Sequence, residues 1–278
     1  MSSAGSVVTG RRIGRSATPG RPRSFVPARG SRIVIGLGAV IAAVVCWQLI
    51  YSNNVVDRDL LPSPGQVLEA GWTLASNGDL ANHGWASLKT LTIGYVIAMV
   101  VGIPLGLLMG RVPVLHELFS PPISALYALP YLALIPLIIV ALGTGTKGHG
   151  TIVFLGAFIP IVINAEAGAR DVEPTLLRAA RSFCASPTTT FFKVLVPAAA
   201  GPILAGASLG LGRGILAVVV AELFASTEGI GNLINLYGLN LNTPYLYFLV
   251  LFVGLVSFIL TRILTYAAHL LGYQEGGQ

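Results

Sequence analysis

Charged residues are scarce in this chain of 278 residues. Asp, Glu, Lys and Arg make up 10% of the sequence, whereas a soluble domain usually carries roughly 25%. Hydrophobic residues make up 54%, and the mean hydropathy is +0.78. So few charges cannot cover the surface of an ordinary soluble fold, and so many apolar residues exclude disorder for most of the chain. The composition therefore predicts an all-α, polytopic membrane protein.

Groups that perform catalysis or bind metals are also few. Of the two cysteines, Cys46 lies in an apolar run and Cys184 in a polar segment, and no spacing fits a disulfide or a metal site. No Ser/His/Asp set and no pair of carboxylates is visible in the sequence. The segment Gly143–Gly148 is rich in glycine and holds a lysine, but it lacks the Gly-Lys-Ser/Thr order of a phosphate-binding loop. We therefore expect this chain to be no enzyme and to hold no cofactor or metal.

The basic charge is confined to one part of the chain. Residues 1–32 contain seven arginines and no acidic residue, whereas the remainder has ten Lys and Arg against eleven Asp and Glu, a net charge of −1. Because nucleic-acid binding needs basic residues on a folded face, we expect no nucleic-acid partner. The segment 1–32 is instead predicted to be a disordered cytoplasmic tail that contacts anionic membrane lipid.

Long apolar stretches predict six membrane helices in a domain covering residues 33–273, with a short tail at 274–278. With the amino terminus inside, thirteen Lys and Arg lie in cytoplasmic segments and three outside, so both termini are predicted in the cytoplasm. Pro130 and Pro136 predict kinks in the third span. The six stretches are Ile33–Ile50, Lys89–Met109, Ile123–Leu142, Thr151–Ala165, Ala198–Leu223 and Pro244–Tyr266.

Glycines recur every four residues in two of these stretches. Such a spacing lines one face of a helix and allows a second helix to approach closely. The two predicted glycine faces consist of Gly102, Gly106 and Gly110, and of Gly206, Gly210 and Gly214.

A polar segment, Glu166–Pro197, interrupts a protein whose other loops are short. Pro174 suits the first turn of a helix, and Ser186 followed by Pro187 repeats this signal. The segment therefore predicts two short helices that lie at the membrane surface. From the residues alone, it is either a contact surface for a partner or an ordinary linker between spans.

This polar segment resembles the "EAA" loop of permease subunits of ABC importers. That pattern is Glu-Ala-Ala, three residues, Gly, nine residues, then Ile-x-Leu-Pro, and Ala179, Ala180 and Pro197 match it at the correct spacing. Two positions depart, because Arg178 stands where Glu is usual and Cys184 where Gly is usual. Glycine adopts a left-handed turn more easily than cysteine does, so the turn expected there is in question.

The resemblance extends over roughly residues 55–265 and is to the permeases for sulfonates, taurine and nitrate. It includes the motifs Leu61–Pro64, Gly102–Gly110, Ile135–Leu137 and Ala221–Leu223. It implies the six-helix fold of type I importers, a second permease copy in a homodimer, two separate ATPase subunits that bind ATP and Mg, and an extracytoplasmic binding protein. It also implies import of a small anionic solute. A stand-alone secondary transporter or channel remains the alternative, and an integral membrane enzyme is a third possibility.

The resemblance further implies which residues contact the ATPase. The small Ala179 and Ala180 would let the helix sit deep in a groove of the partner, and apolar neighbours would either contact the partner or pack onto the bundle. The complete set of coupling residues is Leu176, Leu177, Arg178, Ala179, Ala180, Arg181, Phe183, Cys184, Ala185, Ser186 and Pro197.

A translocation path is predicted from polar residues within the spans. Charges inside membrane helices are costly and usually face a cavity or a partner. Arg213 therefore either attracts an anionic substrate or pairs with a structural group, and Glu222 is predicted at a gate or interface. Asn164 and Tyr131 complete the predicted path.

Overall fold

The structure, a computed structural model, describes residues 29–270. Every regular element within this range is helical. The predicted tails lie outside it, except that helix α1 (Arg29–Ser52) already begins within the predicted segment 1–32. Contacts divide the chain into two units, Met1–Cys46 and Trp47–Gln278. The described part of the first unit is a stretch of α1 that includes most of the predicted span Ile33–Ile50.

Four helices of the second unit are long and apolar enough to cross a membrane: α3 (Asp79–Met109), α6 (Thr146–Asp171), α10 (Ala200–Ala225) and α12 (Thr243–Leu270). A bent pair of helices raises the number to five, and the apolar segment Gly38–Ser52 of α1 is shorter than these. Among the described residues, four or five membrane-spanning helices therefore follow from length and composition.

The predicted fourth span was too short. We placed it at Thr151–Ala165, whereas α6 begins at Thr146 and continues to Asp171. The polar residues from Glu166 onward belong to this helix because Arg170 lies one turn after Glu166, and the two side chains form an ion pair of 2.7 Å. The polar segment was predicted to begin at Glu166, but its first six residues belong to α6, and the connection to the next helix begins only at Val172.

The predicted third span, Ile123–Leu142, is not one continuous helix. It starts earlier, as α4 (Pro113–Ala128), and continues as η1 (Tyr131–Leu134) and α5 (Ile135–Leu142), bent by 86° to α4. Pro130 lies in the break, as predicted, because proline lacks the N–H that continues a helix. Pro136 instead lies in the first turn of α5, where proline starts a helix and produces no kink.

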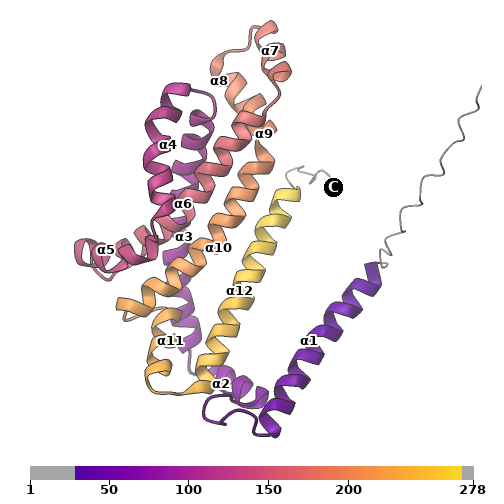
Figure 1. The fold of residues 1–278 in the computed structure, drawn as a ribbon, viewed down its shortest axis with the longest axis vertical. Coiled ribbons are helices and arrows are strands. Elements are labelled where there is room, and N and C mark those ends of the chain that lie inside the picture. The colour runs from indigo at the N-terminus through magenta and orange to yellow at the C-terminus, as the bar shows by residue number, and fades with distance from the viewer. Residues whose placement is uncertain (1–28, 271–278) are drawn as a thin grey trace, which may run out of the picture. The chain divides into compact units, whose positions relative to one another are not determined.

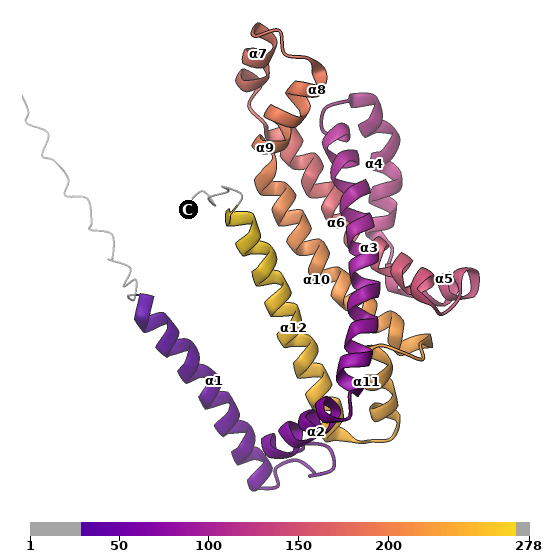
Figure 2. The ribbon, with the colours of Figure 1, turned by 180° about the vertical axis from the view of Figure 1, so that it is seen from behind.

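Helix α6 lies between α3 and α10 and packs along both (Figures 1 and 2). Both predicted glycine faces are confirmed, and both point at α6. A methyl group on Gly106 would lie 2.8 Å from Cβ of Ala165, and one on Gly210 would lie 2.9 Å from Cγ1 of Ile161. Such separations are too short for a side chain, so glycine is required for the close approach.

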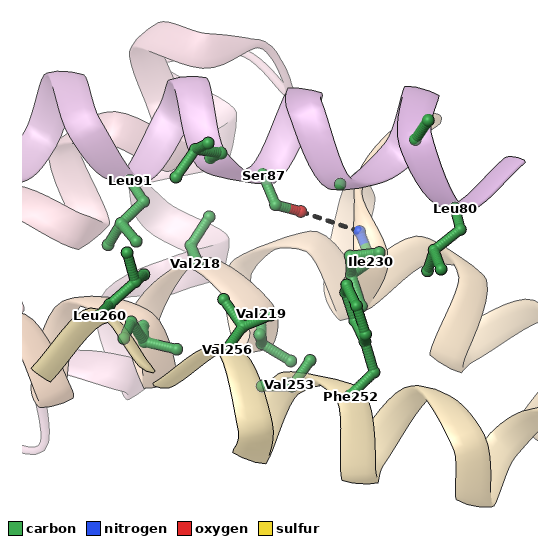
Figure 3. A pocket seen from close by; sticks show the side chains of 14 residues that line it. Leu80, Ser87, Leu91, Val218, Val219, Ile230, Phe252, Val253, Val256 and Leu260 are labelled. Atoms are coloured by element: carbon green, nitrogen blue, oxygen red, sulfur yellow. Dashed lines mark hydrogen bonds between the residues drawn. The ribbon is translucent and has the colours of Figure 1, made fainter. Parts of the chain in front are cut away.

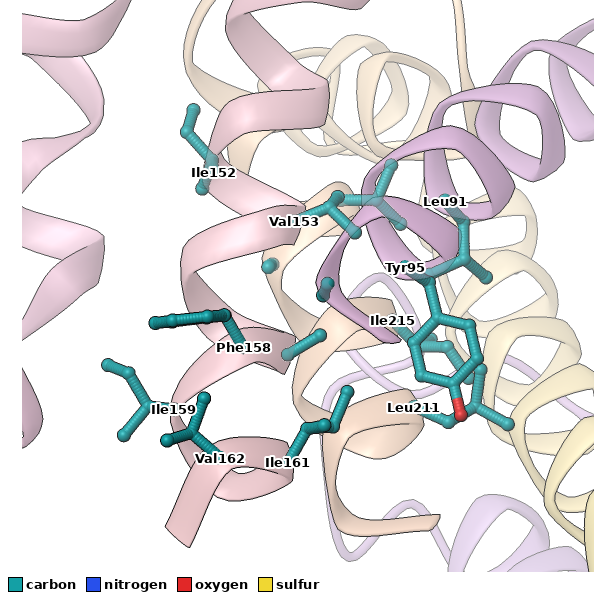
Figure 4. Packing of buried hydrophobic residues seen from close by; sticks show 14 of the residues in the cluster. Leu91, Tyr95, Ile152, Val153, Phe158, Ile159, Ile161, Val162, Leu211 and Ile215 are labelled. Atoms are coloured by element: carbon teal, nitrogen blue, oxygen red, sulfur yellow. The ribbon is translucent and has the colours of Figure 1, made fainter. Parts of the chain in front are cut away.

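Apolar side chains from these three helices form the main core (Figure 4). Leu91 and Tyr95 from α3 meet Val153 and Ile161 from α6 and Ile215 from α10. The Tyr95 hydroxyl donates a 2.9 Å hydrogen bond to the backbone carbonyl of Ala207 in α10. The buried tyrosine thus links α3 to α10 without leaving its polar atom unpaired.

A second core lies at the opposite end of the bundle from the polar segment. It joins α2 (Pro64–Ser76), α11 (Ile230–Leu239) and α12 through Leu74, Leu233 and Leu249. Ser63 caps α2, since its side chain accepts from the N–H of Gln66 while the Gln66 side chain accepts from the N–H of Ser63.

Candidate functional site

The polar segment between α6 and α10 folds into short helices, as predicted. They are α7 (Pro174–Ser182), α8 (Pro187–Thr190), η2 (Phe191–Leu195) and α9 (Val196–Ala198). The side chain of Ser186 caps α8 by accepting a 3.2 Å hydrogen bond from the N–H of Thr189. Figure 1 shows α7 and α8 at the end of the bundle, where they project beyond the long helices.

Helix α7 has one face on the bundle and one face exposed. Leu177 packs against an apolar cluster that includes Leu107 and Leu195, and Ala180 is 9% exposed. The two predicted alanines therefore lie on different faces, since Ala179 is exposed. The remaining coupling residues of α7 are exposed, as are Phe183 and Cys184 just after it: Leu176, Arg178, Arg181, Phe183 and Cys184.

The turn that ends α7 is left-handed even though its residue is not glycine. Cys184 has a φ of 51°, and its N–H donates to the carbonyl of Arg181 at 2.9 Å. The N–H of Ala185 donates to the carbonyl of Ala180 at 3.0 Å, which completes a Schellman cap. The left-handed turn expected at this position is therefore present. Its cost is that Cys184, which has a Cβ, adopts a left-handed backbone conformation that favours glycine.

We expect Cys184→Gly to stabilise the end of α7 by about 1 kcal/mol, because it removes the left-handed penalty. Hydrogen exchange of a peptide covering residues 178–186 would then slow by about fivefold. Cys184→Ala is the matched control, since it removes the thiol and keeps Cβ, and it should leave the exchange rate unchanged. Equal exchange in the glycine variant and the parent protein would contradict this account of the turn.

Two residues of the predicted path, Arg213 and Tyr131, lie next to each other. The guanidinium of Arg213 lies over the ring of Tyr127, with 5.6 Å between its carbon and the ring centroid. The hydroxyl of Tyr131 donates to the backbone carbonyl of Arg213 at 3.5 Å. A cation over an aromatic face is stabilised by the ring quadrupole, so Arg213 has a partner on α4.

The other two residues of the predicted path lie elsewhere. Asn164 donates a 2.8 Å hydrogen bond to the carbonyl of Pro160 in its own helix, and its Cβ packs close to the backbone of Gly206. Glu222 is 3% exposed and lines a polar cavity of about 280 Å³ together with Lys89. The structure therefore does not bring Arg213, Glu222 and Asn164 to one place.

The carboxylate of Glu222 belongs to a cluster that caps α11. It accepts hydrogen bonds from the Ser87 hydroxyl at 2.7 Å and from the N–H of Gly231 at 3.0 Å. Ser87 in turn accepts from the N–H of Ile230 at 2.8 Å, and Nδ1 of His83 accepts from the N–H of Gly229 at 3.0 Å. Three donors at the start of α11 are thus satisfied by α3 and α10.

Sequence reasoning did not find the roles of His83 and Ser87. The one available signal was the run Gly229-Ile230-Gly231 at the start of a helix, which offers no side chain for capping. Its donors needed acceptors from elsewhere in the chain, and single-sequence patterns do not identify acceptors that lie more than a hundred residues away.

An apolar pocket of about 300 Å³ lies beside this cap, between α3, α10, α11 and α12 (Figure 3). Leu91, Val219 and Phe252 are among its apolar lining residues. Ser87 is its one polar lining side chain, and Figure 3 shows the Ser87 hydroxyl bonded to the backbone nitrogen of Ile230. With its polar group already used, this pocket suits apolar groups only.

A cluster of charged side chains at the end of the bundle that carries α7 also escaped sequence analysis. Oε1 of Glu166 lies 2.7 Å from Nδ1 of His116 and 2.7 Å from a guanidinium nitrogen of Arg170. Nearby, the side chain of Arg111 donates to the carbonyl of Val172 at 3.4 Å. Burial lowers the pKa of Arg111 from its ordinary value. These contacts tie the ends of α3 and α4 to the end of α6.

Long apolar helices packed around α6, with an exposed helical elbow at one end, define a multi-pass membrane protein. The family model described as "binding-protein-dependent transport system inner membrane component" matches residues 102–272, which include α6, α7 and α10. The chain belongs to this family, whose members are transport components rather than catalytic subunits.

Curated relatives agree over most of the chain. A probable ABC transporter permease protein of Brucella melitensis is 32% identical, with 85% of this chain and 95% of the relative covered. The taurine transport system permease protein of Escherichia coli is 30% identical over 82% and 85%, and the nitrate import permease protein of Synechocystis is 31% identical over 90% and 92%. These matches favour an ABC permease over the stand-alone transporter or channel.

Solved structures show the same fold. An inward-facing structure of the MetNI methionine ABC transporter has a TM-score of 0.58, 19% identity, and coverage of 71% of this chain and 96% of that chain. Another crystal form has a TM-score of 0.55, 23% identity, and coverage of 67% and 91%. The arrangement of helices around α6 is therefore one that a solved ABC transporter adopts.

Proposed function

We propose that this permease is the membrane subunit of an ATP-driven importer for a small anionic solute such as a sulfonate, taurine or nitrate. An extracytoplasmic binding protein delivers the solute, and ATP and Mg bind in two separate ATPase subunits. The names of the relatives support this substrate class. The observation that carries the proposal is the exposed face of α7, which projects from the bundle with apolar and basic side chains and a small residue between them.

Within this proposal, the chain crosses the bacterial cytoplasmic membrane six times, and both termini are cytoplasmic. Helix α1 supplies the first span and the bent pair of α4 and α5 the third. The excess of Lys and Arg in the proposed cytoplasmic segments supports the orientation. The arginine-rich segment that precedes α1 is a tail at the anionic lipid surface, and a second copy of the chain completes the channel.

Coupling to ATP follows from the way α7 is held. Leu177 and Ala180 attach one face of the helix to the bundle, so a force applied to the opposite face is transmitted to α6 and α10. The small side chain of Ala179 permits close approach of the ATPase. Leu176 is 47% exposed and Phe183 is 86% exposed, so both apolar side chains are available to contact it. Nucleotide-driven closure of the ATPase pair then moves α7 as a rigid lever.

Arg213 is the proposed attraction for the anion inside the membrane. Its contact with the Tyr127 ring orients the guanidinium without neutralising its charge. The hydroxyl of Tyr131 holds the backbone of α10 at Arg213 through its hydrogen bond to the Arg213 carbonyl. Because Glu222 is engaged in capping α11, its role is to hold that helix at the other end of the bundle, whether or not the solute passes nearby.

Purification of the tagged permease from native membranes tests the proposal. We expect an ATPase to co-purify at about one copy per permease and to hydrolyse ATP in the complex. A permease that purifies without any ATPase under conditions that preserve its own dimer would contradict the proposal.

A further inference from the structure

One face of α4 is polar although the helix is otherwise mostly apolar. His116, Ser120, Ser124 and Tyr127 follow each other at intervals of four, four and three residues, which places them on the same side of the helix. Leu118 lies on the opposite side and is 62% exposed. Polar residues of a membrane helix normally face a cavity or a partner.

This polar face lines a cavity of about 340 Å³ between α4 and α6. Glu166 and Arg170 complete its polar lining from α6. The volume lies within the range of small-molecule sites, roughly 300–1,000 Å³. The hydroxyls of Ser120 and Ser124 make no hydrogen bond within the described residues, so they remain available as donors to a ligand.

One positive charge beside the cavity is not neutralised: Arg213 is not itself a lining residue, but it contacts the lining residue Tyr127. Arg170 and Glu166 form an ion pair of 2.7 Å and neutralise each other, and His116 contacts the same carboxylate oxygen. At the end of the polar face, Arg213 lies over the Tyr127 ring without a carboxylate partner among the described residues. A positive field with free hydroxyl donors favours an oxyanion over a cation.

We propose that this α4–α6 cavity is a binding site for a small oxyanion in the cytoplasmic half of the protein, a site through which the solute leaves. The hydroxyls of Ser120, Ser124 and Tyr127 donate to the anion, and Arg213 supplies the attraction. The inference rests on the proposed function for the identity of the bound anion and for the orientation of the chain in the membrane.

Thiol accessibility tests the site without knowledge of the substrate. In the full complex in inside-out vesicles, Cys46→Ala and Cys184→Gly remove the native thiols, and Ser124→Cys introduces one at the cavity. Its thiolate attacks a methanethiosulfonate reagent, forms a mixed disulfide and releases methanesulfinate. The probes are the anionic sulfonatoethyl reagent and the cationic trimethylammonioethyl reagent, each rate being divided by that with a free thiol.

We expect the anionic reagent to modify Ser124→Cys faster than the cationic reagent, and ethanesulfonate to slow the reaction. Arg213→Gln should lower the ratio of anionic to cationic rates by about fivefold, whereas Arg213→Lys should preserve it. Glu166→Gln should raise the ratio, because it frees the charge of Arg170. Leu118→Cys is the matched control on the same helix and should show no preference that depends on Arg213.

A preference for the cationic reagent, or a ratio that Arg213→Gln leaves unchanged, would overturn the proposal, and so would an unreactive thiol at residue 124. The labelling does not depend on ATP. Charge-selective labelling in a protein that lacks an ATPase partner would therefore refute the proposed function and leave this site intact. Labelling without charge selectivity in a protein that does bind an ATPase would refute the site alone.

Discussion

Replacing Ala179 by tryptophan is expected to remove at least nine-tenths of the ATPase that co-purifies with the permease. Ala179 lies on the exposed face of α7, where the partner must approach closely, and an indole there holds the two surfaces apart. A tenfold loss of binding corresponds to about 1.4 kcal/mol, a modest value for a bulky residue at the centre of an interface. Densitometry of the purified complex measures the ratio of the two subunits.

Two variants control this prediction. Leu68→Trp adds the same side chain at a 71% exposed position of α2, at the opposite end of the bundle from α7, and should retain the ATPase. Ala180→Trp places the indole against the bundle, so we expect it to lower thermal stability first. The account of α7 would be contradicted if Ala179→Trp retained a full complement of ATPase.

Replacing Glu222 by alanine is expected to destabilise the permease by about 3 kcal/mol. The change leaves the Ser87 hydroxyl and the N–H of Gly231 without their buried acceptor, and each such loss costs roughly 1–3 kcal/mol. The resulting fall in melting temperature is about 5–10 °C, measurable by thermal unfolding of the detergent-purified protein.

The neighbouring exposed residue Glu228 provides the control for Glu222. Glu228→Ala should change stability by less than about 0.5 kcal/mol, as is usual for surface substitutions. Glu222→Gln should lie between the two, since its amide oxygen still accepts a hydrogen bond. Equal melting temperatures for Glu222→Ala and Glu228→Ala would show that the cap of α11 does not depend on this carboxylate.

Features set by local spacing were predictable from the sequence. The glycines of α3 and α10 predict that another helix approaches closely, because residues spaced by four lie on one helix face. Pro130 predicts a break in a helix, and Pro174 and Ser186 predict the starts of α7 and α8. These effects are local, because each residue changes the hydrogen bonding of the backbone within one turn of itself.

Features that depend on distant parts of the chain were not predictable. The end of α6 was misjudged because Glu166 and Arg170 are polar, and their pairing with each other and with His116 depends on where α4 lies. The hydrogen bonds of Glu222 could not be predicted, because its two donors come from another helix and from the start of α11. That Ala179 is exposed while Ala180 is buried could not be predicted either, because it depends on how α7 is oriented against the bundle.

Solute uptake into proteoliposomes tests the central claim most directly. The vesicles would contain the permease with its co-purified ATPase and enclosed MgATP, with radiolabelled taurine or nitrate and the binding protein outside. The account predicts uptake against a gradient that stops when ATP or the binding protein is omitted, and that falls to background with Ala179→Trp. Uptake by the permease alone, driven by an ion gradient without ATP, would contradict it.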